Sequence, residues 1–327
     1  MRFVPRGTIP RLGGLPKMFH VEQSACGGLA HRALNLQITL APRWCANYHG
    51  LAMIFADLAL SRRLEAAEAS ACALFAEARS RAVPSSGACS IHPAGTTAVF
   101  DGVDSPCTQT FGLGLFEELT TASLDLIEQF FLEREAPVVH EVSPFAGVGT
   151  LDLLCRRGYR PIELSSVLYQ AVQCPPPAEE GPLRVRLAGP QEAGLWAQLS
   201  ARGWAGEQPG LEEFLLNFGA VVAARTQSYC FLAAIDGKPG AAGVLSVHEG
   251  VALFGGAATV PEMRRRGLQN ALLAERMRFA SELGCDLAMM VTLPGSDSQR
   301  NAQRNGFHIA YTRTKWQMQA AYPAATG

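Results

Sequence analysis

The sequence predicts an α/β protein with mixed sheets (α+β in part) that carries one order of elements twice. Segments of helical periodicity alternate with short apolar runs typical of strands. The proline-rich segment CPPPAEEGP, at 174–182, cannot continue either kind of element and reads as a linker. We therefore expect two tandem domains, 53–173 and 183–322, each a mostly antiparallel sheet flanked by helices.

The segment 1–52 precedes the first periodic pattern. It holds four cations and no acid before Glu22, and Pro and Gly interrupt any period. It lacks the apolar core and cleavage site of a secretory leader. We expect a poorly ordered extension that is not needed by the functional protein, with Met53 as its start.

The first half then reads as a chain of alternating elements. Apolar residues return at helical spacing from Phe55 to Ala82, with charges on the other side. The elements expected after this helix are a strand at 107–115, a helix at 119–135, a strand at 136–144, a short helix at 150–157 and a strand at 158–172.

The second half contains a longer version of the same order. The expected elements are a strand at 183–187, helices at 189–205 and 211–225, strands at 228–235, 241–247 and 251–260, a helix at 268–283, a strand at 285–293, a short helix at about 296–305 and a strand at 307–319. The last strands of the two halves have similar sequences, RRGYRPIELSSVLYQ and RNGFHIAYTRTKWQM. In both, a glycine followed by an aromatic residue precedes the strand. This echo indicates a doubled fold.

Composition narrows the classes of function. The net charge is −1, so no overall field draws the chain to nucleic acid or an anionic membrane. No apolar run reaches the roughly 20 residues of a membrane span. The nine cysteines form no CxxC pair and no zinc-like spacing with His. We expect a cytoplasmic protein with reduced thiols, no metal, no nucleic-acid partner and no membrane partner.

The loop PEMRRRG, at 261–267, is the strongest functional signal. It follows the strand 251–260 and opens directly into the helix 268–283. A helix N-terminus presents unpaired amides and a positive dipole end, and Gly267 permits close approach of the backbone to a ligand. The arginines add charged donors. The loop is either a phosphate cradle or a solvated basic turn.

This arrangement resembles the GNAT superfamily of N-acetyltransferases, in which a central strand leads to a loop of pattern Q/R-x-x-G-x-G/A and a long helix. Here the pattern lies at Arg264–Gln269, with Gln269 in place of the last small residue. The block SQRNAQRNGF continues the likeness, which covers roughly 183–320. The resemblance implies acetyl-CoA as cofactor, held by Ala258, Thr259, Val260, Arg264, Arg265, Arg266, Gly267, Leu268, Gln269, Asn270 and Asn301.

The first half resembles a degenerate copy that lacks the phosphate loop. Glu117 and Glu118 follow its strand 107–115, where a cradle needs amides and cations. We expect the first half to form a wall of the acceptor pocket or to act as a structural partner.

The resemblance implies direct attack of an amine on the thioester in a ternary complex, with an acid for the leaving thiolate. The family's usual tyrosine position is Ala302 here, so we take Tyr311 as the candidate acid. Glu249 is the candidate base. Further base candidates are His248, Glu262 and His140.

Three readings of function stay open. The first is an N-acetyltransferase acting on a small-molecule amine or a protein amine. The second is a non-catalytic acyl-CoA sensor or interaction protein, which the missing tyrosine favours. The third is a small-molecule acetyltransferase similar to mycothiol synthase. The chain is expected to be a monomer or a dimer.

Overall fold

The computed structural model describes residues 54–173, 175, 181–205 and 212–319. The predicted extension 1–52 and most of the predicted linker 174–182 lie outside the described residues. Within the described part, the predicted fold class is confirmed: a large mixed sheet is flanked by helices.

The helices and strands of the described residues alternate along the chain much as the periodicity predicts. The helices are α1 (Leu58–Ala82), α2 (Thr121–Leu132), α3 (Gly147–Arg156), α4 (Ala193–Ala205), α5 (Glu212–Ala224), α6 (Leu268–Glu282) and α7 (Asp297–Arg304). The strands are β1 (Cys89–Ile91), β2 (Thr97–Phe100), β3 (Gln109–Phe111), β4 (Val139–Val142), β5 (Tyr159–Ala171), β6 (Leu183–Leu187), β7 (Ser228–Ile235), β8 (Lys238–His248), β9 (Val251–Thr259), β10 (Leu287–Thr292) and β11 (His308–Met318). The short strands β1 and β2 were not predicted. None of the described helices has the length and hydropathy needed to cross a membrane.

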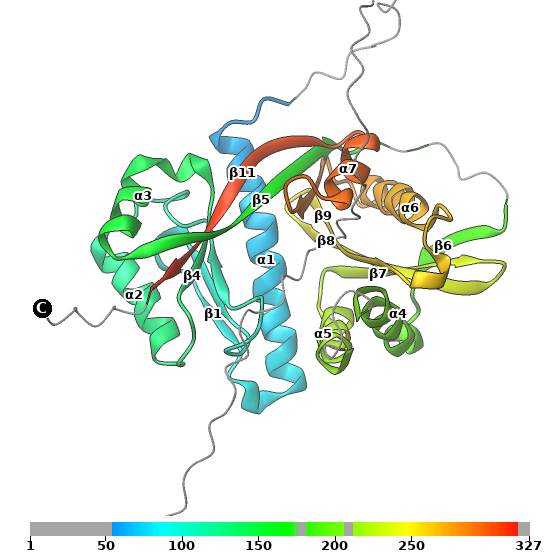
Figure 1. Ribbon diagram of the computed structural model, residues 1–327, viewed down its shortest axis with the longest axis horizontal. Helices are drawn as coiled ribbons and strands as arrows, with labels where there is room; N and C mark the ends of the chain where they lie inside the picture. Colours follow the sequence, from blue (N-terminus) through cyan, green and yellow to red (C-terminus); the bar gives the residue numbers. More distant parts are fainter. Residues whose placement is uncertain (1–53, 174, 176–180, 206–211, 320–327) are drawn as a thin grey trace, which may run out of the picture.

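All the described strands join one sheet, in which the two halves exchange their last strands. The order is β1-β2-β3-β4-β11-β5-β10-β9-β8-β7-β6. β11 ends the second half but pairs with β4 of the first, while β5 ends the first half and pairs with β10 of the second. β5 and β11 also pair with each other along most of their length, side by side through the middle of the molecule (Figure 1). The exchange fuses the two halves into one continuous sheet.

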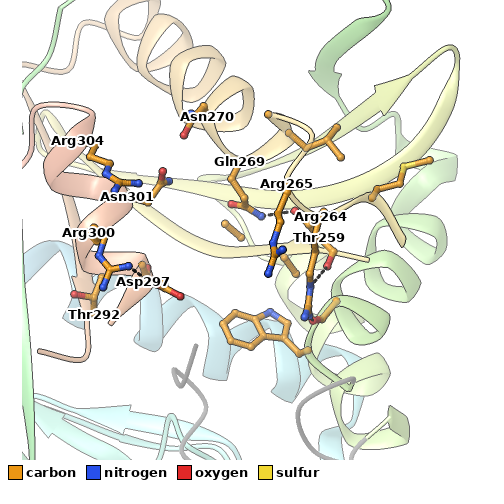
Figure 2. Close-up of a pocket in the computed structure, with 18 of the residues that line it drawn as sticks. Thr259, Arg264, Arg265, Gln269, Asn270, Thr292, Asp297, Arg300, Asn301 and Arg304 are labelled. Atoms are coloured by element: carbon orange, nitrogen blue, oxygen red, sulfur yellow. Dashed lines mark hydrogen bonds and ion pairs between the residues drawn. The ribbon is translucent and has the colours of Figure 1, made fainter. Parts of the chain in front are cut away.

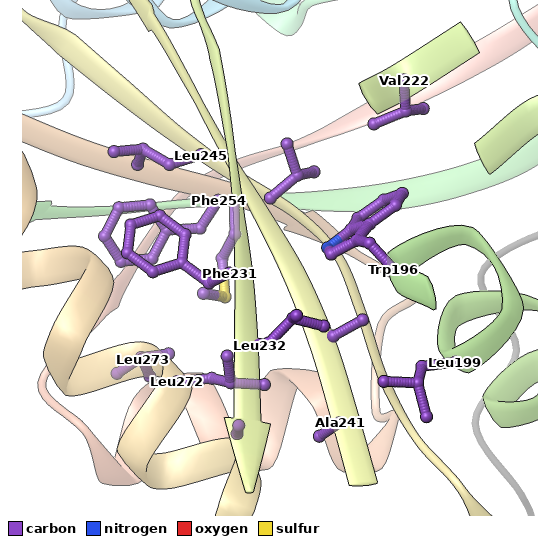
Figure 3. Packing of buried hydrophobic residues seen from close by; sticks show 14 of the residues in the cluster. Trp196, Leu199, Val222, Phe231, Leu232, Ala241, Leu245, Phe254, Leu272 and Leu273 are labelled. Atoms are coloured by element: carbon purple, nitrogen blue, oxygen red, sulfur yellow. The ribbon is translucent and has the colours of Figure 1, made fainter. Parts of the chain in front are cut away.

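The alternation of side chains along the strands decides which helix covers which face. In β2, Ala98 and Phe100 pack with α2 and α3, whereas Val99 between them packs against α1. α1 crosses the middle of the sheet in Figure 1. At the right of Figure 1, α6 packs against one face of β7–β9 and α4 packs against the other, as the close-up in Figure 3 shows.

A bulge between β8 and β9 shapes the strand that leads to the loop 261–267, which we call the arginine loop. The register shifts between Ala242 and Val244, which frees nearby carbonyl groups. The Trp196 indole donates to the Gly243 carbonyl at 3.1 Å. The buried Arg276 guanidinium donates to the carbonyls of Val244 and Gly255 at 3.1 and 3.2 Å. These hydrogen bonds supply donors to buried carbonyl groups that are not paired between β8 and β9 at the bulge.

The pairing of β9 with β10 stops halfway along both strands. They pair in parallel only as far as Met289 and Leu253. Beyond that point β9 continues on β8 to Thr259, and β10 continues on β5 to Thr292. An open wedge therefore lies between the C-terminal ends of two adjacent parallel strands, with the arginine loop following one of them.

Candidate functional site

A cleft of about 560 Å³ occupies the wedge between β9 and β10. The end of β9, the following loop, the first turn of α6, the end of β10 and α7 form its walls, with α4 at one side. We call it the arginine cleft; its lining residues are Gly203, Trp204, Ala257, Ala258, Thr259, Met263, Arg264, Arg265, Gly267, Leu268, Gln269, Asn270, Val291, Thr292, Asp297, Ser298, Arg300, Asn301 and Arg304.

The N-terminus of α6 opens into this cleft without a capping side chain. Gly267 is the N-cap residue, with φ +83°, a left-handed conformation that favours glycine. Within the part of the chain that the structure describes, no side chain caps this helix end. The amides of that turn have no intrahelical acceptor and lie at the positive end of the helix dipole. The first turn of α6 is therefore suited to an anion.

Arg264 and Arg265 add positive charge from the loop side. Arg264 Nη2 donates to the Gly203 carbonyl at 2.9 Å, and its Nε donates to the Thr259 carbonyl at 3.3 Å, so this side chain braces the loop against α4 and β9. Gln269 Nε2 donates to Thr259 Oγ1 at 2.7 Å and ties the first turn of α6 to the strand end. Arg265 is exposed. The loop is thus positioned by its own side chains and leaves Arg265 free to face solvent or a ligand.

Two cations on the opposite wall were missed by the sequence reasoning. Arg300 and Arg304 project from α7 toward the cleft, facing Arg264 and Arg265 across it (Figure 2). Arg300 Nη1 donates to Asp297 Oδ1 at 2.8 Å. The signal was present, because residues four apart lie on one face of a helix, and a helix was predicted over this segment.

Most of the predicted cofactor-binding residues lie in one place. Those that line the arginine cleft are Ala258, Thr259, Arg264, Arg265, Gly267, Leu268, Gln269, Asn270 and Asn301. Two predicted residues do not line it. Val260 is buried, with its amide donating to the Gly240 carbonyl at 3.0 Å, and Arg266 is an exposed residue of the loop.

The two predicted catalytic residues lie outside the arginine cleft. The Tyr311 hydroxyl is buried on β11 and donates to Glu65 Oε1 at 2.9 Å, and burial raises its pKa well above the ordinary value. Glu249 occupies the turn between β8 and β9, at the far end of β9 from Thr259. The reason is topological: the strand exchange carries Tyr311 away from the wedge, onto the face packed against α1.

The further base candidates are also absent from the cleft lining. His248 shares the turn of Glu249, at the far end of β9. His140 is buried on β4, with Nδ1 2.7 Å from Thr110 Oγ1, and burial lowers its pKa to about 3. Glu262 is exposed and pairs with Arg202 at 2.5 Å. None of these three groups contacts the wedge.

The chemistry of the arginine cleft is that of an anion site. Its titratable lining side chains, among the described residues, are Arg264, Arg265, Arg300, Arg304 and Asp297. Ala302, the position of the missing tyrosine, is buried in the core beneath α7. The lining therefore offers cations and backbone amides for phosphate groups. Its described residues include no tyrosine, histidine or cysteine that could act as an acid.

Comparison with known proteins identifies the fold. No protein-family model matches the sequence, and no curated protein matches it. A GCN5-related N-acetyltransferase from Kribbella flavida superposes with a TM-score of 0.54 at 18% identity, covering 77% of this chain and 97% of that chain. Two further structures superpose with a TM-score of 0.49 each: a GCN5-related N-acetyltransferase from Sphaerobacter thermophilus, at 18% identity over 72% of this chain and 77% of that one, and a tandem GNAT protein from the clavulanic acid biosynthesis pathway, at 12% identity over 69% and 79%.

Proposed function

We propose that this chain, which has the fold of the GCN5-related N-acetyltransferases, is itself an N-acetyltransferase. It transfers the acetyl group of acetyl-CoA to an amine acceptor by direct attack in a ternary complex. The observation that carries the proposal is the position of the arginine cleft: an uncapped helix N-terminus and four arginines surround a wedge between two parallel strands.

The arginine cleft fits the chemistry of coenzyme A. Phosphate groups would bind the first-turn amides of α6 next to Gly267, with charge-assisted bonds from Arg265 and from α7. The open edge of β9 at Ala258 and Thr259 would pair with the amides of the pantetheine arm, as a strand edge pairs with an extended peptide. Acetyl-CoA supplies an electrophilic thioester carbon and a thiolate leaving group.

Transfer needs a neutral amine and stabilisation of the oxygen that gains charge. Backbone amides along the unpaired part of β9 are the donors this chain offers at the wedge. Asp297 is the one carboxylate of the described lining, and it is engaged by Arg300. The proton of the amine therefore leaves through water or through a group that the acceptor brings close.

A second candidate function is a non-catalytic acyl-CoA sensor. The specific observation that favours it is the absence of an acid from the described lining of the arginine cleft, in which Asp297 is the one carboxylate. The position of the family's usual tyrosine is held by Ala302, which is buried in the core. Such a protein would bind acetyl-CoA tightly without turnover.

The deciding experiment uses the purified full chain. Calorimetry with coenzyme A is expected to give one site per chain, because the first half has Glu117 and Glu118 where a cradle would need cations. Turnover of acetyl-CoA is then measured with a panel of amines, and the readout is the free thiol of the coenzyme A that is released. Turnover with any amine excludes the sensor. Binding without turnover supports the sensor, and no binding excludes both functions.

A further inference from the structure

A second cavity of about 330 Å³ lies beside the arginine cleft, between the two halves of the chain. Strands β4, β5 and β11 form its floor, and α1, α5 and the loop before β3 form its sides. Val291 and Thr292, at the end of β10, line both hollows. The two cavities therefore adjoin each other at the end of β10, across the wedge from the arginine loop.

We call it the carboxylate cavity, because Glu68, Asp104, Glu141 and Glu163 line it. They come from α1, the loop before β3, β4 and β5. Two cations share the lining: Arg313 and Lys315, both on β11. Among the described lining residues the carboxylates thus outnumber the cations, and their formal charge is negative.

The cations are already engaged by the wall itself. Arg313, 1% exposed, pairs with Glu68 at 2.6 Å and with Glu141 at 2.9 Å. Lys315 Nζ lies 3.2 Å from Glu141 and 3.7 Å from Glu163. Burial would raise the pKa of Glu141, but Arg313 and Lys315 outweigh burial and lower it, so this carboxylate stays ionised. The charge left for a ligand is therefore negative. Of the two carboxylates on the floor, Glu141 and Glu163, Glu163 is the more weakly paired.

Thr292 marks the junction of the two hollows. The residue is 3% exposed, and its Oγ1 has no hydrogen-bond partner among the described residues. A buried hydroxyl of this kind is normally satisfied, so a ligand group at the junction would supply the missing bond. A neutral amine can both donate to a hydroxyl oxygen and accept from the hydroxyl.

We propose that the carboxylate cavity binds the amine acceptor, and that the acceptor carries a second, positively charged group in addition to the amine that is acetylated. This rests on the proposed function. The reacting nitrogen must be neutral to attack, so it cannot be the group that balances the carboxylates. A second ammonium group near Glu163 balances them, while the reacting amine lies at Thr292. Diamines and amino-bearing polycations have this chemistry.

The test compares three acceptors of equal chain length that differ only at the remote end: cadaverine, aminopentanol and aminopentanoate. With the full chain and saturating acetyl-CoA, kcat/KM is expected to fall in that order. The ammonium group should be favoured over the hydroxyl group by on the order of tenfold, as is typical of charge-assisted hydrogen bonds. Glu163→Gln is expected to raise KM for cadaverine and to leave KM for aminopentanol unchanged.

Glu118→Gln is the matched control, because it removes one carboxylate from an exposed site that lines neither hollow. Glu163 is half-buried and its nearest described cation is 3.7 Å away, so the fold should survive its substitution, as melting curves will check. Equal kcat/KM for the three acceptors, or a Glu163→Gln protein with unchanged selectivity, overturns the proposal. So does coenzyme A binding with no binding or acetylation of cadaverine. Failure to bind coenzyme A refutes the proposed function instead.

Discussion

Replacing Gly267 by alanine tests the proposed phosphate site at the N-terminus of α6. Gly267 has φ +83°, and a Cβ built on it would meet only Leu183 Cδ1, at 3.7 Å. The protein itself therefore has room for the methyl group. A ligand that uses the first-turn amides of α6 would have to share that space.

The cost to stability can be separated from the cost to binding. Left-handed backbone costs an L-residue about 1–2 kcal/mol, so Gly267→Ala should lower the melting temperature by a few degrees. Gly284, just beyond the other end of α6, has φ +73° and no heavy atom within 4 Å of its Cβ position. Gly284→Ala therefore carries the same backbone strain with no ligand nearby, and it is the matched control.

The assay is calorimetric titration of both variants with coenzyme A. Gly267→Ala is expected to bind at least tenfold more weakly than the parent, a loss of about 1.4 kcal/mol, while Gly284→Ala binds as the parent does. The reasoning is refuted if Gly267→Ala melts like the control and still binds coenzyme A with the affinity of the parent.

Four further outcomes are expected. Arg300→Gln and Arg304→Gln should each weaken coenzyme A binding by about 1 kcal/mol, and the loss should be larger at low salt than at high salt. Calorimetry at two ionic strengths checks this, and unchanged affinity would show that α7 is not part of the proposed phosphate site. Burial raises the pKa of Glu65 from 4.5 to about 7, so the unfolded state ionises first and the free energy of unfolding should fall as pH rises between these values. Glu65→Gln should flatten that dependence in denaturant titrations, and an unaltered pH profile would contradict the assignment. Deleting 1–50 should leave the melting temperature and the affinity for coenzyme A unchanged. A large drop in either quantity would show that this segment is needed for the structure or for binding. The fragment 181–319 should lack a cooperative melt, because β11 loses both of its partner strands, and a sharp transition by circular dichroism would count against the strand exchange.

The arginine loop and its helix could be predicted because their signals are local. Helical periodicity after Gly267, and the strand before the loop, depend on residues close in the sequence. Two adjacent parallel strands and a following helix then bring Ala258, Thr259, Gln269 and Asn301 to one cleft. The spacing of Arg300 and Arg304 placed them on one face of the predicted helix, but the direction in which that face points depends on how α7 packs, which is not a local signal.

The strand exchange could not be predicted, because side-chain alternation fixes the faces of a strand and not its neighbours. β11 has the same pattern whether it lies beside β10 or beside β4. For that reason Tyr311 was expected near the wedge, whereas it lies on the face that packs against α1. The short strands β1 and β2 were also missed, since three or four residues carry too little periodicity to stand out from a loop.

The exchange also suggests how the first half would serve the proposed reaction without a phosphate loop of its own. β11 brings Arg313 and Lys315 from the second half against Glu68, Glu141 and Glu163 of the first. Neither half has this cluster alone. Buried carboxylates without these cations would be costly to ionise, and the cations without the carboxylates would be equally costly to bury. The wall of the carboxylate cavity is thus made stable by both halves, and its residual negative charge lies next to the wedge, where the proposed reaction needs an amine.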